Sequence, residues 1–147
     1  MSAVRYEQQG AIVQIMVDRP AQLNAINKGV RKGLYEAFEC FEADENAYVA
    51  ILTGFGEKAL CAGINFKEAA QNALGVPQRR FLPIIGDSLT VTKPIIAAVN
   101  GVAYAGGWLF AQMCDLCLAA EHATFGITEA RVDRGMPRAA PLVNMVQ

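Results

Sequence analysis

Hydrophobic and polar residues alternate along the chain with two periods, one typical of strands and one typical of helices. Residues 11–18 alternate between apolar and polar positions, which predicts a half-buried strand that ends before Pro20. From Val30 onward, apolar residues recur at helical spacing, with Asn27 as the candidate N-cap. This pattern predicts a helix that ends near residues 44–46.

Short apolar runs of the length of buried strands follow the predicted helix. They comprise residues 48–54, 95–99 and 115–120. Between them, residues 66–75 suggest a short helix, and residues 78–92 suggest a second one that is opened or kinked around Pro83. Strands that alternate with helices predict an α/β fold with largely parallel pairing.

Composition indicates one globular domain over residues 1–147. Of these 147 residues, 53% are hydrophobic and 18% are charged, and the net charge is −1. With basic residues scattered, we expect neither nucleic acid nor a membrane surface as a partner. No apolar run approaches the ~20 residues of a membrane helix, and no secretory signal pattern is seen, so a soluble, cytoplasmic protein is expected.

The cysteines are expected to be buried, reduced thiols rather than metal ligands. Cys114 and Cys117 form a C-x-x-C pair, a spacing that also occurs in metal and redox sites. However, there is no second pair, and His122 is the single histidine of the chain. We therefore expect no metal site, and thiols that fit a reducing compartment.

Two glycine-containing turns follow predicted strands, in residues 52–68 and 99–110. Each turn leads into an expected helix, whose first backbone N–H groups have no partner within the helix. Two such donors facing one space would form a pocket for an oxyanion. The alternative is that the glycines only turn the chain or allow close packing. Neither turn is a dinucleotide-binding G-x-G-x-x-G motif.

Three segments, taken in order, resemble the motifs of the crotonase superfamily, the enoyl-CoA hydratases and isomerases. They are DRPAQLNAIN, LTGFGEKALCAGINFKE and KPIIAAVNGVAYAGGWLFAQMCDLCLAAEHATFGITE, within a resemblance that runs from about residue 4 to about residue 137. The resemblance implies a crotonase-like spiral of ββα units, an acyl-CoA thioester as substrate, no cofactor beyond that CoA, and a homo-oligomer, a trimer or hexamer in the family. By the same resemblance, we expect the chain to be a core domain truncated before the C-terminal helical region of family members, and to self-associate through an exposed apolar face.

The same resemblance implies roles for residues in both glycine-containing turns. The backbone N–H groups of Ile64 and Gly106 would form the oxyanion hole, and Gly106 would leave room for the thioester oxygen. Other positions would bind the substrate: Ala62, Gly63, Gly107, Trp108 and Leu109. For Trp108, a place in the core is the alternative.

The expected reaction depends on Glu129, in the segment FGITE, and on Leu109. Hydratases of the family use two glutamates, and Leu109 stands where the first is found. A single carboxylate suits double-bond isomerisation, so Glu129 is the expected proton shuttle. Hydration is the alternative, with Asp133 as a candidate second carboxylate. A third possibility is a catalytically inactive acyl-CoA-binding or assembly module, in which Glu129 would be only an exposed carboxylate paired with an arginine.

Overall fold

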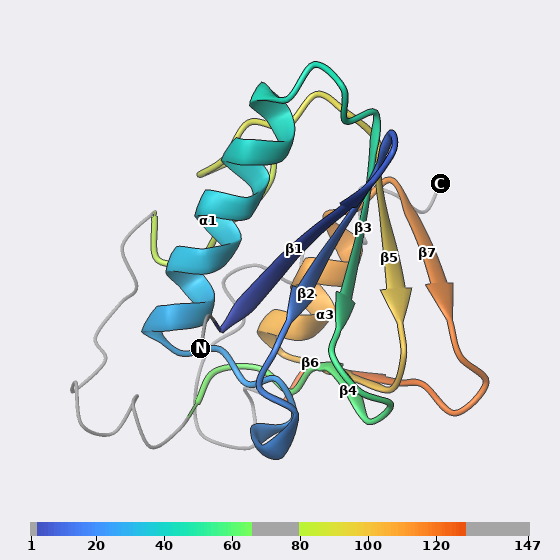
Figure 1. The fold of residues 1–147 in the computed structure, drawn as a ribbon. Helices are drawn as coiled ribbons and strands as arrows, with labels where there is room; N and C mark the ends of the chain where they lie inside the picture. The colour runs from blue at the N-terminus through green and yellow to red at the C-terminus, as the bar shows by residue number, and fades with distance from the viewer. Residues whose placement is uncertain (1–2, 66–79, 129–147) are drawn as a thin grey trace, which may run out of the picture.

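A five-stranded sheet forms the larger layer of the protein (Figure 1). The structure, a computed structural model, describes residues 3–65 and 80–128. The strands of this sheet, in spatial order, are β1 (Val4–Gln9), β2 (Ile12–Val17), β3 (Val49–Gly54), β5 (Ile95–Val99) and β7 (Leu116–Ala119). β1 and β2 form an antiparallel hairpin, and every later neighbour in this sheet pairs in parallel.

A second, smaller sheet lies across one end of the first (Figure 1). It is parallel and contains β4 (Ala59–Cys61), β6 (Val102–Tyr104) and β8 (Thr124–Gly126). Each of its strands follows a strand of the larger sheet, so the chain repeats the step from β3 to β4, β5 to β6 and β7 to β8. This repetition agrees with the predicted spiral, and it places the turns after β4 and β6 beside each other.

The helix α1 (Lys28–Ala43) covers one face of the larger sheet, as its spacing predicts (Figure 1). The side chain of Asn27 caps it by accepting a hydrogen bond from the N–H of Val30 at 2.9 Å. Its buried face carries Val30, Leu34, Ala37, Phe38 and Phe41. None of the described helices is long and apolar enough to cross a membrane.

The strands predicted at residues 11–18, 48–54, 95–99 and 115–120 are confirmed within one or two residues. The periodicity did not predict β1 or the three short strands of the smaller sheet, β4, β6 and β8. The expectation that residues 115–120 are buried is wrong, because Leu116 and Leu118 on β7 are 62% and 65% exposed. β7 is the last strand of the larger sheet, and no described residue covers it.

The prediction of a helix over residues 78–92 is wrong for residues 80–92, which form turns and extended backbone. Gly86 has a φ of +83°, a left-handed conformation that stops a helix. The hydroxyl of Ser88 accepts a hydrogen bond from the N–H of Ile84 and donates one to the carbonyl of Leu82, which closes a tight turn. The helix predicted over residues 66–75 lies outside the described residues.

The prediction of buried cysteines is confirmed for Cys61 and Cys114 and wrong for Cys40 and Cys117. Burial raises the pKa of both buried thiols to about 12. Cys114 lies against the core and donates a hydrogen bond to the carbonyl of Phe110. The other two are exposed: Cys40 lies at the edge of the buried face of α1, beside Tyr6 of β1, and Cys117 lies on the edge strand β7.

The buried amide of Asn24 joins the loop that follows β2 to the small sheet. That loop contains the 3-10 turn η1 (Pro20–Gln22). Asn24 is 1% exposed, and its Oδ1 accepts a hydrogen bond from the N–H of Arg19 at 2.8 Å. Its Nδ2 donates to the carbonyls of Ala59, at 2.7 Å, and Phe55, at 3.2 Å. Asn24 thereby fixes the loop against β4, the strand that leads into the first glycine-containing turn.

Replacing this amide should destabilise the protein. We expect Asn24→Ala to lower the free energy of unfolding by about 2–4 kcal/mol, because three backbone groups lose a buried partner and alanine is disfavoured at the positive φ of this position. Urea unfolding measures the change. Gln22→Ala, in the exposed 3-10 turn, is the control and should change stability by less than about 0.5 kcal/mol. Equal losses in the two variants would contradict this role of Asn24.

Candidate functional site

The first turn, residues 62–65, is held in place by backbone pairing with residues 23–26. The N–H of Ala62 donates to the carbonyl of Leu23 at 3.0 Å, and the carbonyl of Gly63 accepts from the N–H of Ile26 at 2.7 Å. The N–H of Asn65 then donates to the carbonyl of Ile26 at 2.8 Å. The loop fixed by Asn24 therefore sets the position of the first turn.

The second turn, residues 105–107, joins β6 to the helix α3 (Gly106–Gln112). Ala105 has φ 51° and ψ −118°, a conformation that strains any residue with a side chain. Its N–H donates to the carbonyl of Gly126 at 2.8 Å. This hydrogen bond attaches the second turn to the end of β8, three residues before Glu129, which itself lies outside the described residues.

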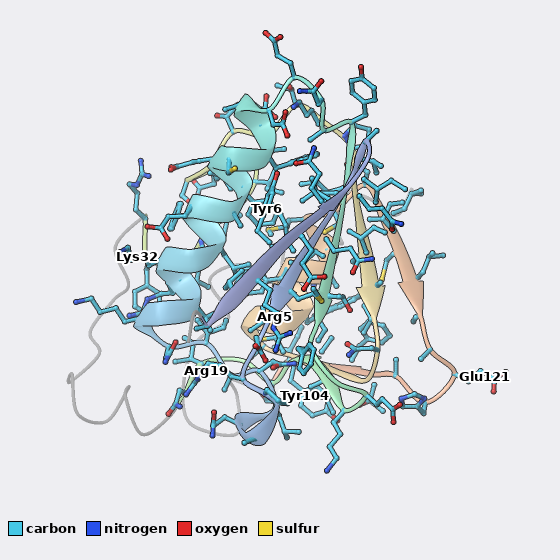
Figure 2. All side chains as sticks on the ribbon, in the orientation of Figure 1. Arg5, Tyr6, Arg19, Lys32, Tyr104 and Glu121 are labelled. Atoms are coloured by element: carbon cyan, nitrogen blue, oxygen red, sulfur yellow. The ribbon has the colours of Figure 1, made fainter. Side chains whose placement is uncertain are left out.

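The two turns are in close contact. Gly63 has a φ of +94°, and a Cβ built on it would lie 2.9 Å from the Cβ of Ala105 and 3.8 Å from the backbone nitrogen of Gly106. Arg19, at the start of the loop that holds the first turn, and Tyr104, just before the second turn, lie toward the same end of the larger sheet (Figure 2). The two turns, which lie some 40 residues apart in the sequence, are thus brought together in space.

The two backbone donors named from the sequence lie in these adjoining turns. Among the residues that the structure describes, no group accepts a hydrogen bond from the N–H of Ile64 or of Gly106. Two N–H groups without a partner among the described residues, in turns that lie close together, could bind one oxyanion. Their role in an oxyanion hole remains a prediction.

The glycines of the second turn are also required for packing. A Cβ on Gly107 would overlap with the backbone carbonyl oxygen of Cys61, so only glycine lets α3 approach β4 this closely. A Cβ on Gly106 would lie 2.7 Å from the Cδ1 of Ile26, the end of a flexible side chain. Of the two explanations that the sequence left open for the glycines, close packing therefore accounts fully for Gly107.

The helix α3 presents different residues to the core and to the turns. Phe110 and Ala111 belong to the hydrophobic core, whereas Leu109 is buried but is not part of that core cluster. Trp108 is half-buried and packs edge-on against Phe125 of β8, with ring centroids 4.8 Å apart. Trp108 also packs against the hydrophobic core, which is the alternative that the sequence left open for it. Trp108 and Leu109 together form an apolar wall directly after the second turn.

Asn24 also shapes the site but was not singled out from the sequence, whereas Ala105 was noted there only as one of the small residues beside the second turn. Asparagine is one of the few residues that adopts a positive φ readily, which is a weak signal for Asn24. The positive φ of Ala105 has no sequence signal, because alanine is not among the residues that adopt this conformation readily.

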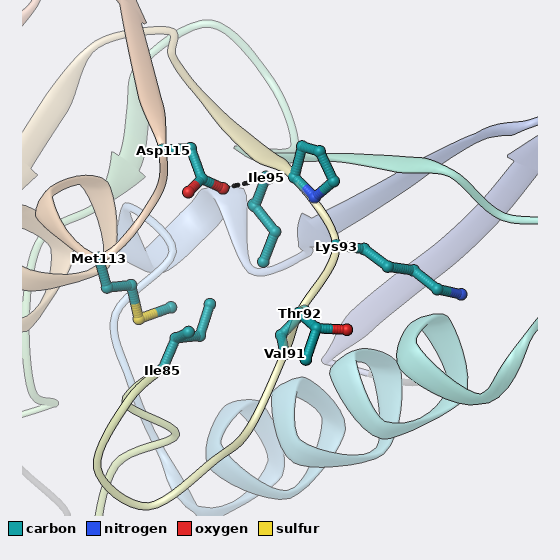
Figure 3. A pocket seen from close by; sticks show the side chains of 8 residues that line it. Ile85, Val91, Thr92, Lys93, Ile95, Met113 and Asp115 are labelled. Carbon is teal, nitrogen blue, oxygen red and sulfur yellow. Dashed lines mark hydrogen bonds between the residues drawn. The ribbon is translucent and has the colours of Figure 1, made fainter.

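A pocket of about 310 Å³ lies at the opposite end of β5 from the second turn (Figure 3). Its charged side chains are engaged with backbone groups. Asp115 accepts a hydrogen bond from the N–H of Ile95 at 2.7 Å, and the Nζ of Lys93 donates to the carbonyls of Phe41 and Asp44. None of the residues predicted for the site lines this pocket.

Comparison with known proteins identifies relatives over nearly the whole chain. The family model described as enoyl-CoA hydratase/isomerase matches residues 7–141. A carnitinyl-CoA dehydratase from Salmonella arizonae is 39% identical over 134 residues, which cover 88% of this chain and 50% of that protein. A protein described as a probable mitochondrial enoyl-CoA hydratase, from Dictyostelium discoideum, is 37% identical over 127 residues, or 86% of this chain and 46% of that protein.

Solved structures give the same result for the fold. An enoyl-CoA hydratase from Mycobacterium tuberculosis superimposes with a TM-score of 0.82 at 34% identity, over 95% of this chain and 54% of that one. The predicted crotonase-like fold is therefore confirmed. The chain spans about half the length of the curated relatives that it matches.

The two adjacent glycines of α3 should differ in their tolerance of a methyl group. We expect Gly107→Ala to lower the free energy of unfolding by at least about 2 kcal/mol, because the new Cβ meets the rigid backbone of Cys61. Gly106→Ala, the matched control, should lose less, because the side chain of Ile26 can move. Urea unfolding of both variants tests this, and equal losses would show that α3 shifts freely against β4.

Relieving the strain at Ala105 should stabilise the protein. We expect Ala105→Gly to raise the free energy of unfolding by about 1 kcal/mol, because glycine adopts this conformation without steric conflict. Ala111→Gly, within the same helix, should instead lower it by about 1 kcal/mol or more. If thermal and urea unfolding show a loss in both variants, Ala105 is not strained.

Proposed function

The chain belongs to the enoyl-CoA hydratase/isomerase family, and from this we propose that it acts on an acyl-CoA thioester through an enolate stabilised by two backbone N–H groups. The observation that carries this proposal is the contact between the first and second turns, with Ile64 and Gly106 as the donors. Negative charge that develops on the thioester oxygen would be held by both donors. One such donor typically contributes about 3–4 kcal/mol of transition-state stabilisation.

For the reaction, we propose that a single carboxylate, Glu129, moves a double bond from the 3-position to the 2-position of the acyl chain. Its carboxylate would take a proton from C2, and the electron pair would pass into the thioester carbonyl to form a dienolate. Return of the same proton to C4 gives the conjugated 2-enoyl thioester. The apolar Leu109 supports this reaction, because it can neither hold nor deprotonate a water molecule.

A second candidate is the addition or removal of water across the 2,3 double bond. It is favoured by the names of the relatives, which include a carnitinyl-CoA dehydratase and enoyl-CoA hydratases. This reaction needs a second group that positions the water. The candidate that the sequence offers, Asp133, lies outside the described residues.

The remaining features of the proposed substrate follow from the thioester itself. Ala62, Gly63 and Gly107 would border the thioester, and Trp108 and Leu109 would line the acyl chain. We propose no cofactor beyond the CoA that the substrate carries. Self-association, as a homo-oligomer, is proposed on the basis of the exposed apolar residues of β7.

The ultraviolet absorbance of the conjugated enoyl thioester distinguishes the two reactions. After a 3-enoyl-CoA is added to the folded protein, we expect the absorbance to rise. We expect Glu129→Gln to lower the rate by about 100- to 10,000-fold, because the proton shuttle is lost while the thioester site remains.

Glu121→Gln is the control, because this glutamate is exposed and lies outside the proposed site (Figure 2). It should leave the rate unchanged. A loss of absorbance from a 2-enoyl-CoA, without any isomerisation of the 3-enoyl-CoA, would favour hydration. If a non-reacting acyl-CoA binds but neither reaction is seen, the chain is a binding module and the catalytic proposal fails.

A further inference from the structure

The side-chain carbonyl oxygen of Gln112, near the end of α3, is buried without a described partner. The residue is only 7% exposed, and among the residues that the structure describes none donates a hydrogen bond to its Oε1. A buried carbonyl oxygen left unpaired costs free energy, and native proteins seldom tolerate one without a reason. Neither the core packing nor the proposed reaction accounts for this amide.

Gln112 lies on the same face of α3 as Leu109. The two residues are three positions apart, which places them one above the other on a helix. This face is not the core face, since Phe110, Ala111 and Cys114 pack into the hydrophobic core and Leu109 is buried outside it. Gln112 is therefore a polar group that extends the apolar wall proposed to line the acyl chain.

The distance along the helix places Gln112 beyond the reacting carbons. Leu109 is three residues from Gly106 and Gln112 is six, which corresponds to about 4.5 Å and about 9 Å along the helix axis. Long side chains on a helix lean toward its N-terminus, so the amide of Gln112 reaches back toward Leu109. It would meet the acyl chain farther from the thioester than Leu109 does.

We propose that Gln112 determines substrate specificity by accepting a hydrogen bond from a hydroxyl group on the distal part of the acyl chain. This inference rests on the proposed function, because it requires the acyl chain to follow this face of α3. The substrate class is then a hydroxylated acyl-CoA rather than one with a plain hydrocarbon chain. The hydroxyl would satisfy the Oε1 that has no partner among the described residues.

Binding of saturated thioesters, which lack the reacting double bond, tests the proposal without turnover. Calorimetric titration of the 147-residue chain would compare butyryl-CoA with 4-hydroxybutyryl-CoA, and hexanoyl-CoA with 6-hydroxyhexanoyl-CoA. In at least one pair, we expect the hydroxylated member to bind about three- to tenfold more tightly. Gln112→Met, similar in length but without an acceptor, should abolish this difference and leave the affinity for the unhydroxylated thioester within twofold.

Met113→Leu is the matched control, because it changes the neighbouring residue, which packs against the core, and it should keep the preference. Thermal unfolding gives a second readout, and Gln112→Met should unfold at the same temperature or higher because a buried unpaired carbonyl is removed. Equal affinities within both pairs for the unaltered protein would overturn the inference while leaving the proposed function intact. A clearly lower Tm in Gln112→Met would also overturn it, because the amide would then be bonded within the protein. If no thioester binds at all, the proposed function itself fails.

Discussion

The first and second turns approach so closely at Gly63 and Ala105 that a side chain on Gly63 would not fit, and the position of both turns depends on this contact. Each turn follows a strand of the small parallel sheet, β4 or β6, and these strands pair directly with each other. Because the two strands run in parallel, their carboxyl ends meet at one edge, and the chain that leaves each strand must turn there. The left-handed Gly63 and the strained Ala105 are the local consequences of fitting two turns into that space.

Several elements outside the site keep this contact in register. The amide of Asn24 holds the loop after β2 against β4, and residues 23–26 then pair with the first turn. On the other side, the N–H of Ala105 donates to the carbonyl of Gly126, which attaches the second turn to the end of β8. Gly107 has no side chain, which lets α3 lie directly against the carbonyl of Cys61. The position of a backbone N–H donor depends on these contacts, because a backbone group cannot change its direction by rotating a side chain.

The chemistry proposed for the site follows from the mixture of groups on α3. Its first residue carries an N–H without a described protein partner, its middle offers the apolar Leu109, and its end carries the buried amide of Gln112. Within the proposed function, this order along one helix would match the order of groups along an acyl thioester: carbonyl oxygen, reacting carbons and distal chain. The face toward the core is uniformly apolar, which fixes the helix while leaving the other face free to vary with the substrate.

The sequence by itself determined the type and place of most elements, the α/β class and the family. Periodicity was sufficient for α1 and for four strands of the larger sheet, because alternation and helical spacing record which face of an element is buried. The motifs in residues 62–65 and 105–107 also indicated where a site would form. The tertiary structure alone decided that residues 80–92 are not helical, that β7 is an exposed edge, and that Cys40 and Cys117 are exposed. It also separated the packing role of Gly107 from that of Gly106, and revealed that the Oε1 of Gln112 has no partner among the described residues. These features depend on which segment, if any, lies against a given residue, and a linear pattern of apolar and polar positions does not contain that information.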